Sequence, residues 1–295
     1  MRRVATPVVM GLVVLAMLSG ALAPPEAVAG GKMYWTDLGI KKIQRVNVDG
    51  TGLQDLVTQG LLAPRGMAVD VAGGKMYWLD SLTLKLQRAN LDGSGVEDLV
   101  TTGLSSPGAI ILDVARGQMY WTDSATDKIQ RANLDGSHIE DLVTRGLQAP
   151  WGIALDATKG KMYWTDAGTG KIQRANLDGS GVEDLVTTGL HLPGEITLDA
   201  TKGKMYWADA GTHKIRRANL DGSGLEDLVT RELSTPWALA LDVAGGKMYW
   251  TDAGTGKIQR ANLDGSGVED LIMTYSSGPA GGGGQRYGLA LELGK

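Results

Sequence analysis

A Tyr-Trp pair recurs every 43 residues along this chain, six times and without one insertion. The pairs account for 12 of the 16 aromatic residues, so the aromatic content is part of the repeat. The units at 160–185 and 246–271 are identical at all 26 positions. A fixed period of this kind is the signature of a repeat architecture, and it constrains the fold more than any local pattern does.

Two architectures suit this period, helical arrays of about 40–47 residues per unit and propeller blades of about 40–45. The unit at 150–192 decides between them, because Pro150 and the six glycines from Gly160 to Gly189 break it and leave no room for two packed helices. Strands of about 5–6 residues joined by short turns account for its length. We therefore predict four strands per unit, at 152–156, 161–166, 171–177 and 182–187.

The two ends of the chain complement each other. The first Tyr-Trp run starts at Lys32 and lacks the strand beginning with Pro, as in the Pro-x-Gly of 150–152, that precedes the other five runs. The segment 287–292, YGLALE, matches the strand at 151–156, WGIALD, and no further unit follows it. Pairing these ends would remove the exposed edges of an open array. The predicted fold is all-β: a closed six-bladed propeller at 30–295, with a Gly-rich linker at 276–285 and a closing strand at 286–293 that completes the first blade.

The motif around each Tyr-Trp pair resembles the YWTD repeat, the low-density-lipoprotein receptor class B repeat. Tyr-Trp-Thr-Asp stands at 34–37, 120–123, 163–166 and 249–252, and the other two units read YWLD and YWAD. The resemblance covers about residues 31–295 and implies an extracellular six-bladed propeller that serves mainly to bind proteins. Receptor relatives also carry cysteine-rich modules, which are missing here, so lipoprotein uptake is not implied.

The first 29 residues predict a signal peptide. Arg2 and Arg3 precede the apolar run 8–18, and the small-residue pattern Ala27-Val28-Ala29 offers a cleavage site. The alternative is a retained membrane anchor at 4–23, a stretch long enough to span a bilayer. We expect a secreted protein, extracellular or periplasmic, with no membrane span after cleavage.

Composition excludes several classes of chemistry. The chain has no Cys, which removes disulfides, thiolate zinc sites, iron–sulfur clusters and cysteine catalysis. Its net charge of −4 gives no electrostatic footprint for nucleic acid. We expect a monomer that binds no nucleic acid.

Most of the repeated residues are expected to be structural. A Tyr and a Trp in every blade suit the wedge between neighbouring blades, where a backbone group can satisfy the N–H or O–H. The Asp that closes each motif is expected to accept hydrogen bonds. The sequence Asn176–Gly181 resembles the start of a calcium loop, but Thr187 stands where such a loop needs Glu, and an Asp-Gly hairpin explains it without metal.

The units differ where the inner strands begin. Loops after the second and fourth strands share one end of the propeller, which we call the top face. The residue after each proline varies around the mouth of the channel there: Arg65, Gly108, Trp151, Gly194 and Trp237, with Tyr287 in the closing strand. Arg, Trp and Tyr are enriched at interface hot spots, and in YWTD relatives the top face is the usual partner surface. Two interpretations stay open: these side chains bind a partner, or they only plug the mouth.

The fifth unit is the most divergent. Glu195 replaces Gly or Ala near the channel mouth, while His191 and His213 occupy two top loops. Together they would hold a metal ion or sense pH, and the alternative is two solvated histidines. Six acids end the inner strands and would either attract a cation or cap nearby backbone: Asp70, Asp113, Asp156, Asp199, Asp242 and Glu292.

Two functions follow from these patterns. The first is a non-enzymatic binding module that presents Arg65, Trp151, Glu195, Trp237 and Tyr287 to a protein or glycan. The alternative is a calcium-dependent, lactonase-like hydrolase with a metal in the channel, which would need unlike residues from unlike blades. Because the blades are near copies, we expect the binding module, with no catalytic residue and no cofactor. Bound Ca²⁺ in the channel would reverse that order.

Overall fold

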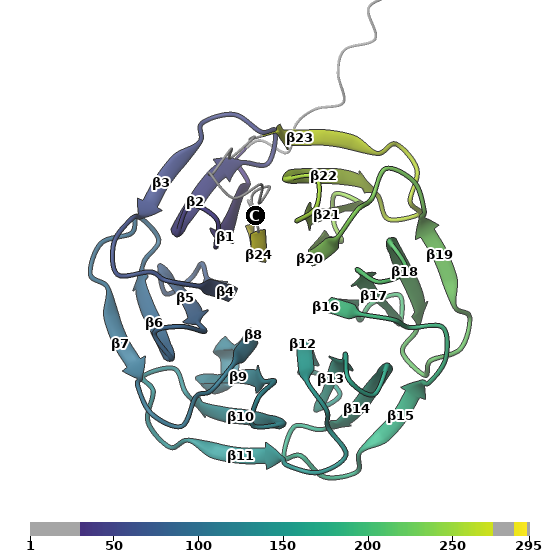
Figure 1. Ribbon diagram of the computed structural model, residues 1–295, viewed down its shortest axis with the longest axis horizontal. Helices are drawn as coiled ribbons and strands as arrows, with labels where there is room; N and C mark the ends of the chain where they lie inside the picture. Colours follow the sequence, from purple (N-terminus) through teal and green to yellow (C-terminus); the bar gives the residue numbers. More distant parts are fainter. Residues whose placement is uncertain (1–29, 274–285, 294–295) are drawn as a thin grey trace, which may run out of the picture.

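Six four-stranded antiparallel sheets surround a central axis in the computed structural model, which describes residues 30–273 and 286–293 (Figure 1). This arrangement confirms the predicted six-bladed propeller. The predicted signal peptide at 1–29 and the linker at 276–285 lie outside the described residues. Within the described residues, no helix is long and apolar enough to cross a bilayer.

The strands have the same bounds in nearly every blade. The inner strands are β4 (Pro64–Asp70), β8 (Pro107–Asp113), β12 (Pro150–Asp156), β16 (Pro193–Asp199), β20 (Pro236–Asp242) and β24 (Arg286–Glu292). The second strands are β1 (Lys32–Asp37), β5 (Lys75–Asp80), β9 (Gln118–Asp123), β13 (Lys161–Asp166), β17 (Lys204–Asp209) and β21 (Lys247–Asp252).

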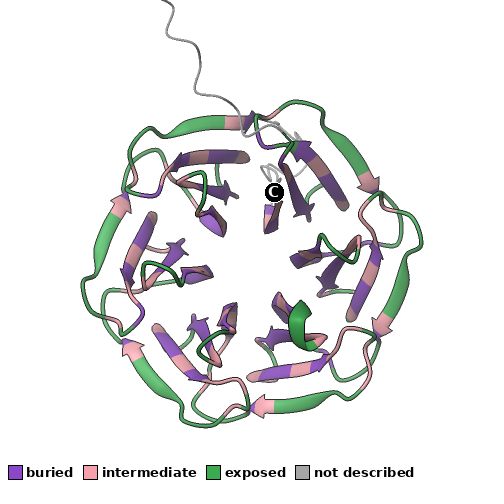
Figure 2. Cartoon of the chain, turned by 180° about the vertical axis from the view of Figure 1, so that it is seen from behind, coloured by how far each residue is buried: buried purple, intermediate pink, exposed green. Residues whose placement is uncertain are grey.

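The third strands are β2 (Lys42–Asn47), β6 (Lys85–Asn90), β10 (Lys128–Asn133), β14 (Lys171–Asn176), β18 (Lys214–Asn219) and β22 (Lys257–Asn262). The outer strands are β3 (Gln54–Val57), β7 (Glu97–Val100), β11 (Glu140–Val143), β15 (Glu183–Val186), β19 (Glu226–Val229) and β23 (Glu269–Met273). A short 3-10 helix, η1 (Val114–Arg116), follows β8 at the bottom face, and Figure 2 shows it near the axis.

The C-terminal strand closes the ring as predicted. In Figure 1 the yellow β24 lies beside the purple β1, and Lys32 pairs with Glu292 at one end of this seam. The backbone N–H of Gly288 donates to Thr36 Oγ1 at 2.9 Å. The buried Arg286 places its Nε 3.4 Å from Asp37 Oδ2 at the other end of the seam.

Aromatic residues fill the wedges between blades. The motif tryptophans are fully buried, and the motif tyrosines are at most 2% exposed. Each inter-blade cluster joins the Tyr of one blade to the Trp of the next, and Tyr249 with Trp35 completes the circle between blades six and one. The outer strands are largely exposed because they carry Asp, Glu or Gln at their starts (Figure 2).

Four of the six motif indoles donate their N–H to a side-chain acceptor, where a backbone partner had been expected. Trp35 in blade one has no acceptor among the described residues, although Gln44 lies opposite it. In four blades Nε1 donates to a Gln Oε1 on the third strand at 3.0–3.1 Å, as Trp78 does to Gln87. In blade five Arg216 replaces this Gln, and the buried Trp207 Nε1 has no partner. The partner was missed because nothing in the spacing alone shows which strand faces the indole.

One arginine per blade links each blade to the next. The Arg of the third strand lies over the Tyr ring of its own blade, 5.7–5.9 Å from its centroid. It also donates to a backbone carbonyl in the following blade, as Arg45 does to Leu91 O at 3.1 Å. Arg260 donates to Val48 O at 3.3 Å and so joins the last blade to the first. Sequence reasoning did not find this contact.

Candidate functional site

Four side chains meet across the top mouth of the channel and form a closed circuit, which we call the plug. It consists of Arg65, Trp151, Trp237 and Tyr287. Trp237 packs edge to face against Trp151 and Tyr287, with ring centroids 5.0 and 5.5 Å apart. The Arg65 guanidinium closes the circuit, 4.8 Å from the Trp151 ring and 5.2 Å from the Tyr287 ring.

Two glycines make room for this circuit. Gly108 and Gly194 hold the remaining two positions around the mouth, and the larger side chains reach across them. A Cβ on Gly108 would lie 2.9 Å from Thr122 Oγ1 and 3.6 Å from a Trp151 ring carbon. A Cβ on Gly194 would lie 2.8 Å from the Trp237 carbonyl oxygen, closer than packed atoms allow. The residues that vary around the mouth therefore fit one another, because the four large side chains occupy the space that the two glycines leave empty.

The plug is held by a side-chain hydrogen bond but reaches solvent. Trp237 is 9% exposed, while Arg65, Trp151 and Tyr287 are half-buried. Arg65 Nε donates to Ser81 Oγ at 2.7 Å, which holds the guanidinium over the two rings. Burial lowers the pKa of Arg65 below its ordinary value, although Tyr287 and Asp80 offset part of this effect.

The motif threonines position the plug through its backbone. Thr36 Oγ1 donates to the carbonyl of Arg65 in the next blade, and Thr122 Oγ1 donates to the carbonyl of Trp151, both at 2.5 Å. Thr251 reaches the carbonyl that precedes Tyr287, at 3.0 Å. Trp237 follows a blade whose motif carries Ala208 in place of Thr. The third letter of YWTD thus couples four of the six blades to the inner strand of the next blade, a role the sequence did not reveal.

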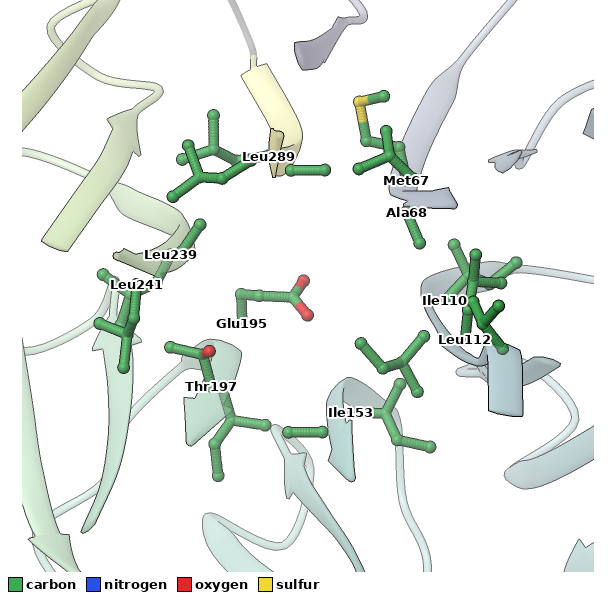
Figure 3. Close-up of a pocket in the computed structure, with 18 residues that line it drawn as sticks. Met67, Ala68, Ile110, Leu112, Ile153, Glu195, Thr197, Leu239, Leu241 and Leu289 are labelled. Carbon is green, nitrogen blue, oxygen red and sulfur yellow. The ribbon is translucent and has the colours of Figure 1, made fainter. Parts of the chain in front are cut away.

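Glu195 lies deeper than predicted. It was expected at the channel mouth with the plug residues, but the structure places it on the wall of the channel below the plug. Figure 3 shows its carboxyl pointing into a cavity of about 280 Å³. A β-bulge between Pro193 and Ile196 shifts the register of β16 at this point, and the equivalent bulge occurs in β4, β8, β12 and β20.

The surroundings of Glu195 are apolar. Aliphatic side chains from the inner strands line most of the cavity, among them Ile110, Leu239 and Leu289 (Figure 3). Burial raises the pKa of the Glu195 carboxyl to about 8, and a hydrogen bond from the Ile153 backbone offsets only part of that rise. A carboxyl in such surroundings is mostly protonated at neutral pH.

The structure does not bring His191, Glu195 and His213 together. Both histidines are exposed on top loops, while Glu195 faces the channel. His213 Nδ1 contacts the Ser234 carbonyl oxygen. Among the described residues, no three His, Asp or Glu side chains lie close enough to hold a metal ion.

The acids at the ends of the inner strands mostly cap their own turns. Each of the five aspartates accepts a backbone N–H from the residue three positions later, as Asp70 does from Gly73 at 2.8 Å. Glu292 instead accepts the Tyr34 hydroxyl at 2.5 Å. Of the two alternatives, capping is the one that the structure shows for the five aspartates.

Comparisons with known proteins agree with this architecture. The family described as low-density lipoprotein receptor repeat class B matches residues 31–71, 74–114, 117–157, 160–199, 203–243 and 246–274. A solved chain from the crystal structure of a nidogen/laminin complex is similar over 90% of this chain and 99% of its own length, with 28% identity and a TM-score of 0.81. A search of curated proteins by sequence gave no significant match.

Proposed function

Because the chain belongs to the low-density lipoprotein receptor class B repeat family, we propose that it is a secreted, non-enzymatic module that binds a protein through its top face. The plug residues Arg65, Trp151, Trp237 and Tyr287 form the centre of the contact surface. The similar solved chain comes from a complex of two proteins, which supports protein binding as the role of the fold.

The closed circuit of the plug is the observation that carries this proposal. Three of its four side chains are half-buried, so each still offers part of its surface to a partner. Their mutual contacts and the Arg65–Ser81 hydrogen bond hold them in place before binding. Side chains ordered in advance lose little conformational entropy on association, and Trp, Tyr and Arg contribute most of the energy at interfaces.

A comparison of three proteins tests the proposal. The wild type, the double variant Trp151→Ala/Trp237→Ala and the control Val182→Ala are used as baits for extracellular material. Val182 is 44% exposed on a hairpin at the opposite face, so the control changes a surface residue without touching the plug. We expect capture by the wild type and the control, and at least a tenfold loss with the double variant.

The fold and the chemistry of the captured partner are checked separately. Circular dichroism establishes that the double variant is folded, and protease or glycosidase treatment of the captured material distinguishes a protein from a glycan. Equal capture by a folded double variant would disprove the role of the plug. A partner removed only by glycosidase would replace protein with glycan.

The alternative hydrolase needs a set of oxygen ligands around the channel. Calcium takes about 6–8 oxygens in proteins. Glu195 is the one carboxylate among the residues that line the channel cavity, and Thr197 is the one hydroxyl. This set is small for calcium, so the binding module remains our proposal. Elemental analysis of the purified protein tests it, because one bound calcium per chain would favour the hydrolase.

A further inference from the structure

The inner strand β16 differs from its five counterparts at two positions, and both face the channel. Glu195 stands where the other strands carry Gly or Ala, and Thr197 stands where they carry Ala or Ile. Residues two apart on a strand share a face, and both side chains line the channel cavity (Figure 3). In a chain of near-identical blades, these two changes place a pair of polar groups on one wall.

The rest of the cavity is hydrocarbon. Its other lining residues are Ala, Val, Ile, Leu and one Met, contributed by all six inner strands and by Val114 of η1. Its volume of about 280 Å³ is large enough for a small organic molecule and too small for a folded partner. The cavity therefore combines one polar strand with an apolar surround.

The bottom end of the channel gives access to this cavity. The plug covers the top mouth, whereas Val114 at the opposite end lines the cavity and is itself 43% exposed. Figure 2 shows η1 on that face, near the ends of the inner strands. A site reached from the bottom is separate from the proposed contact surface on the top face.

Glu195 has no cationic partner among the described residues. Arg65 lies at the top mouth and is engaged by Ser81 and by two aromatic rings. At the bottom end of β16, Asp199 accepts hydrogen bonds from Thr201 and Lys202 in its own turn. No other charged side chain lines the cavity. The ionised Glu195 carboxylate would therefore need a single positive charge from a ligand to balance it.

We propose that the channel binds a small organic amine, whose ammonium group pairs with the Glu195 carboxylate and donates a second hydrogen bond to Thr197 while its hydrocarbon part packs on the aliphatic wall. A primary ammonium carries three donors, and the Glu195 carboxylate and the Thr197 hydroxyl together offer three acceptor oxygens. An anion would find no cationic partner in this cavity, and a metal ion would need more oxygen ligands than the wall offers.

Binding is coupled to release of a proton. The free carboxyl has a pKa of about 8, so at pH 7 about 0.9 of the molecules carry the proton on Glu195. An incoming ammonium stabilises the ionised carboxylate, and that proton passes to the buffer. Titration calorimetry in phosphate and in HEPES, whose ionisation enthalpies differ and neither of which is a primary amine, therefore gives different apparent enthalpies for the same reaction.

Calorimetry with matched probes tests the site in the full chain. The amines are butylamine, hexylamine and 2-phenylethylamine, and the uncharged analogues are 1-hexanol and 2-phenylethanol. We expect at least one amine to bind at least tenfold more tightly than its alcohol. Glu195→Gln should abolish this preference and leave alcohol binding unchanged, and Thr197→Ala should weaken the amine about threefold.

The chain itself provides a folding control. Glu195→Ala/Thr197→Ala gives β16 the residues found at Ala238 and Ala240 of β20, so the variant is compatible with a blade of this fold. It should bind neither class preferentially. The proposal is overturned if no amine binds the wild type more tightly than Glu195→Gln. Equal enthalpies in the two buffers would show that Glu195 is already ionised in the free protein, and would overturn the coupling of binding to proton release.

Discussion

The hydroxyl of Tyr34 donates a hydrogen bond of 2.5 Å to Glu292 across 258 residues of sequence. Tyr34 lies on β1 and Glu292 ends β24, so this contact joins the two ends of the described chain within one blade. Arg45 approaches the same hydroxyl with its Nη1 at 3.4 Å. The seam that closes the ring is thus held by a polar contact as well as by strand pairing.

Removing this hydroxyl should weaken the seam. Tyr34→Phe leaves the Glu292 carboxylate without its donor, and a hydrogen bond to a charged group contributes about 1.5–3 kcal/mol. We expect a loss of that size in the free energy of unfolding, measured by urea denaturation. Tyr120→Phe is the control, because Tyr120 donates to the neutral Gln118 at 3.0 Å within its own blade. A smaller loss for Tyr34→Phe than for the control would contradict this account.

The same contact makes the seam sensitive to alkali. Burial, together with the hydrogen bond to Glu292, raises the pKa of Tyr34 to about 12. Because the folded pKa lies above the unfolded one near 10, the stabilisation is complete below pH 10 and is lost as pH rises through 12. Tyr34→Phe should therefore flatten the stability profile between pH 10 and 12. An unchanged slope in this range would show that Tyr34 does not titrate there.

Arg65 should determine whether the plug stays closed. Arg65→Ala removes two cation–π contacts, which contribute about 0.5–2 kcal/mol each, and it leaves the Trp151 and Tyr287 rings without a bridge. We expect a lower melting temperature and a red shift of tryptophan emission as Trp151 becomes more exposed. Arg65→Lys keeps the charge but lacks the planar group, so its melting temperature and emission should lie between those of the wild type and of Arg65→Ala. Emission identical to the wild type in Arg65→Ala would show that the plug holds without the arginine.

Removing a motif threonine should lower the stability of the fold, and adding the missing one in blade five should raise it. Thr122→Val leaves the Ala109 N–H and the Trp151 carbonyl without their partner, at a cost of about 1–3 kcal/mol. Ala208→Thr should have the opposite effect, since it supplies blade five with the hydroxyl that four other blades already hold and gives the Trp237 carbonyl a donor. Thermal unfolding of both variants measures this. A loss of stability in Ala208→Thr would mean that this blade has no room for the hydroxyl.

The channel carboxyl should lower stability as pH rises. Burial raises the pKa of Glu195 to about 8, above that of an unfolded Glu, so the folded state holds its proton longer. Relative to Glu195→Gln, the wild type should lose up to about 1.4 kcal/mol per pH unit between roughly pH 4.5 and 8, and no more above that. Denaturation of both proteins at several pH values checks this. A difference that does not change with pH would show that Glu195 ionises freely.

The fold was predictable because the same 43-residue unit occurs six times in the sequence. The 43-residue period, the glycine spacing and the unmatched ends fixed the number of blades, the number of strands per blade and the closure between β24 and β1. The strand bounds agree closely: 161–166 was expected and β13 spans Lys161–Asp166. The first strand starts earlier than expected, at Pro150, because its proline end still pairs with Asp166 across the bulge.

The site was predictable only in part. Strand position placed Arg65, Trp151, Trp237 and Tyr287 around one mouth, and the structure brings these four into contact. The Glu195 side chain points into the channel next to a bulge after Pro193, and no residue type in β16 predicts that bulge. The Thr122 and Arg45 contacts join different blades, and sequence spacing within one blade contains no information about them.

The pairing of Lys32 with Glu292 has a mechanical consequence. Because β1 and β24 are antiparallel, the two free ends of the seam leave the disc at the same side. Tension applied between the start of β1 and the end of β24 would break the backbone pairs of the seam one after another, beginning with Lys32 and Glu292, instead of loading all of them at once. The propeller would then open more readily under a pull between the start of β1 and the end of β24 than under a pull that loads all the pairs of the seam together, and anchoring it at only one of these two points would avoid that force.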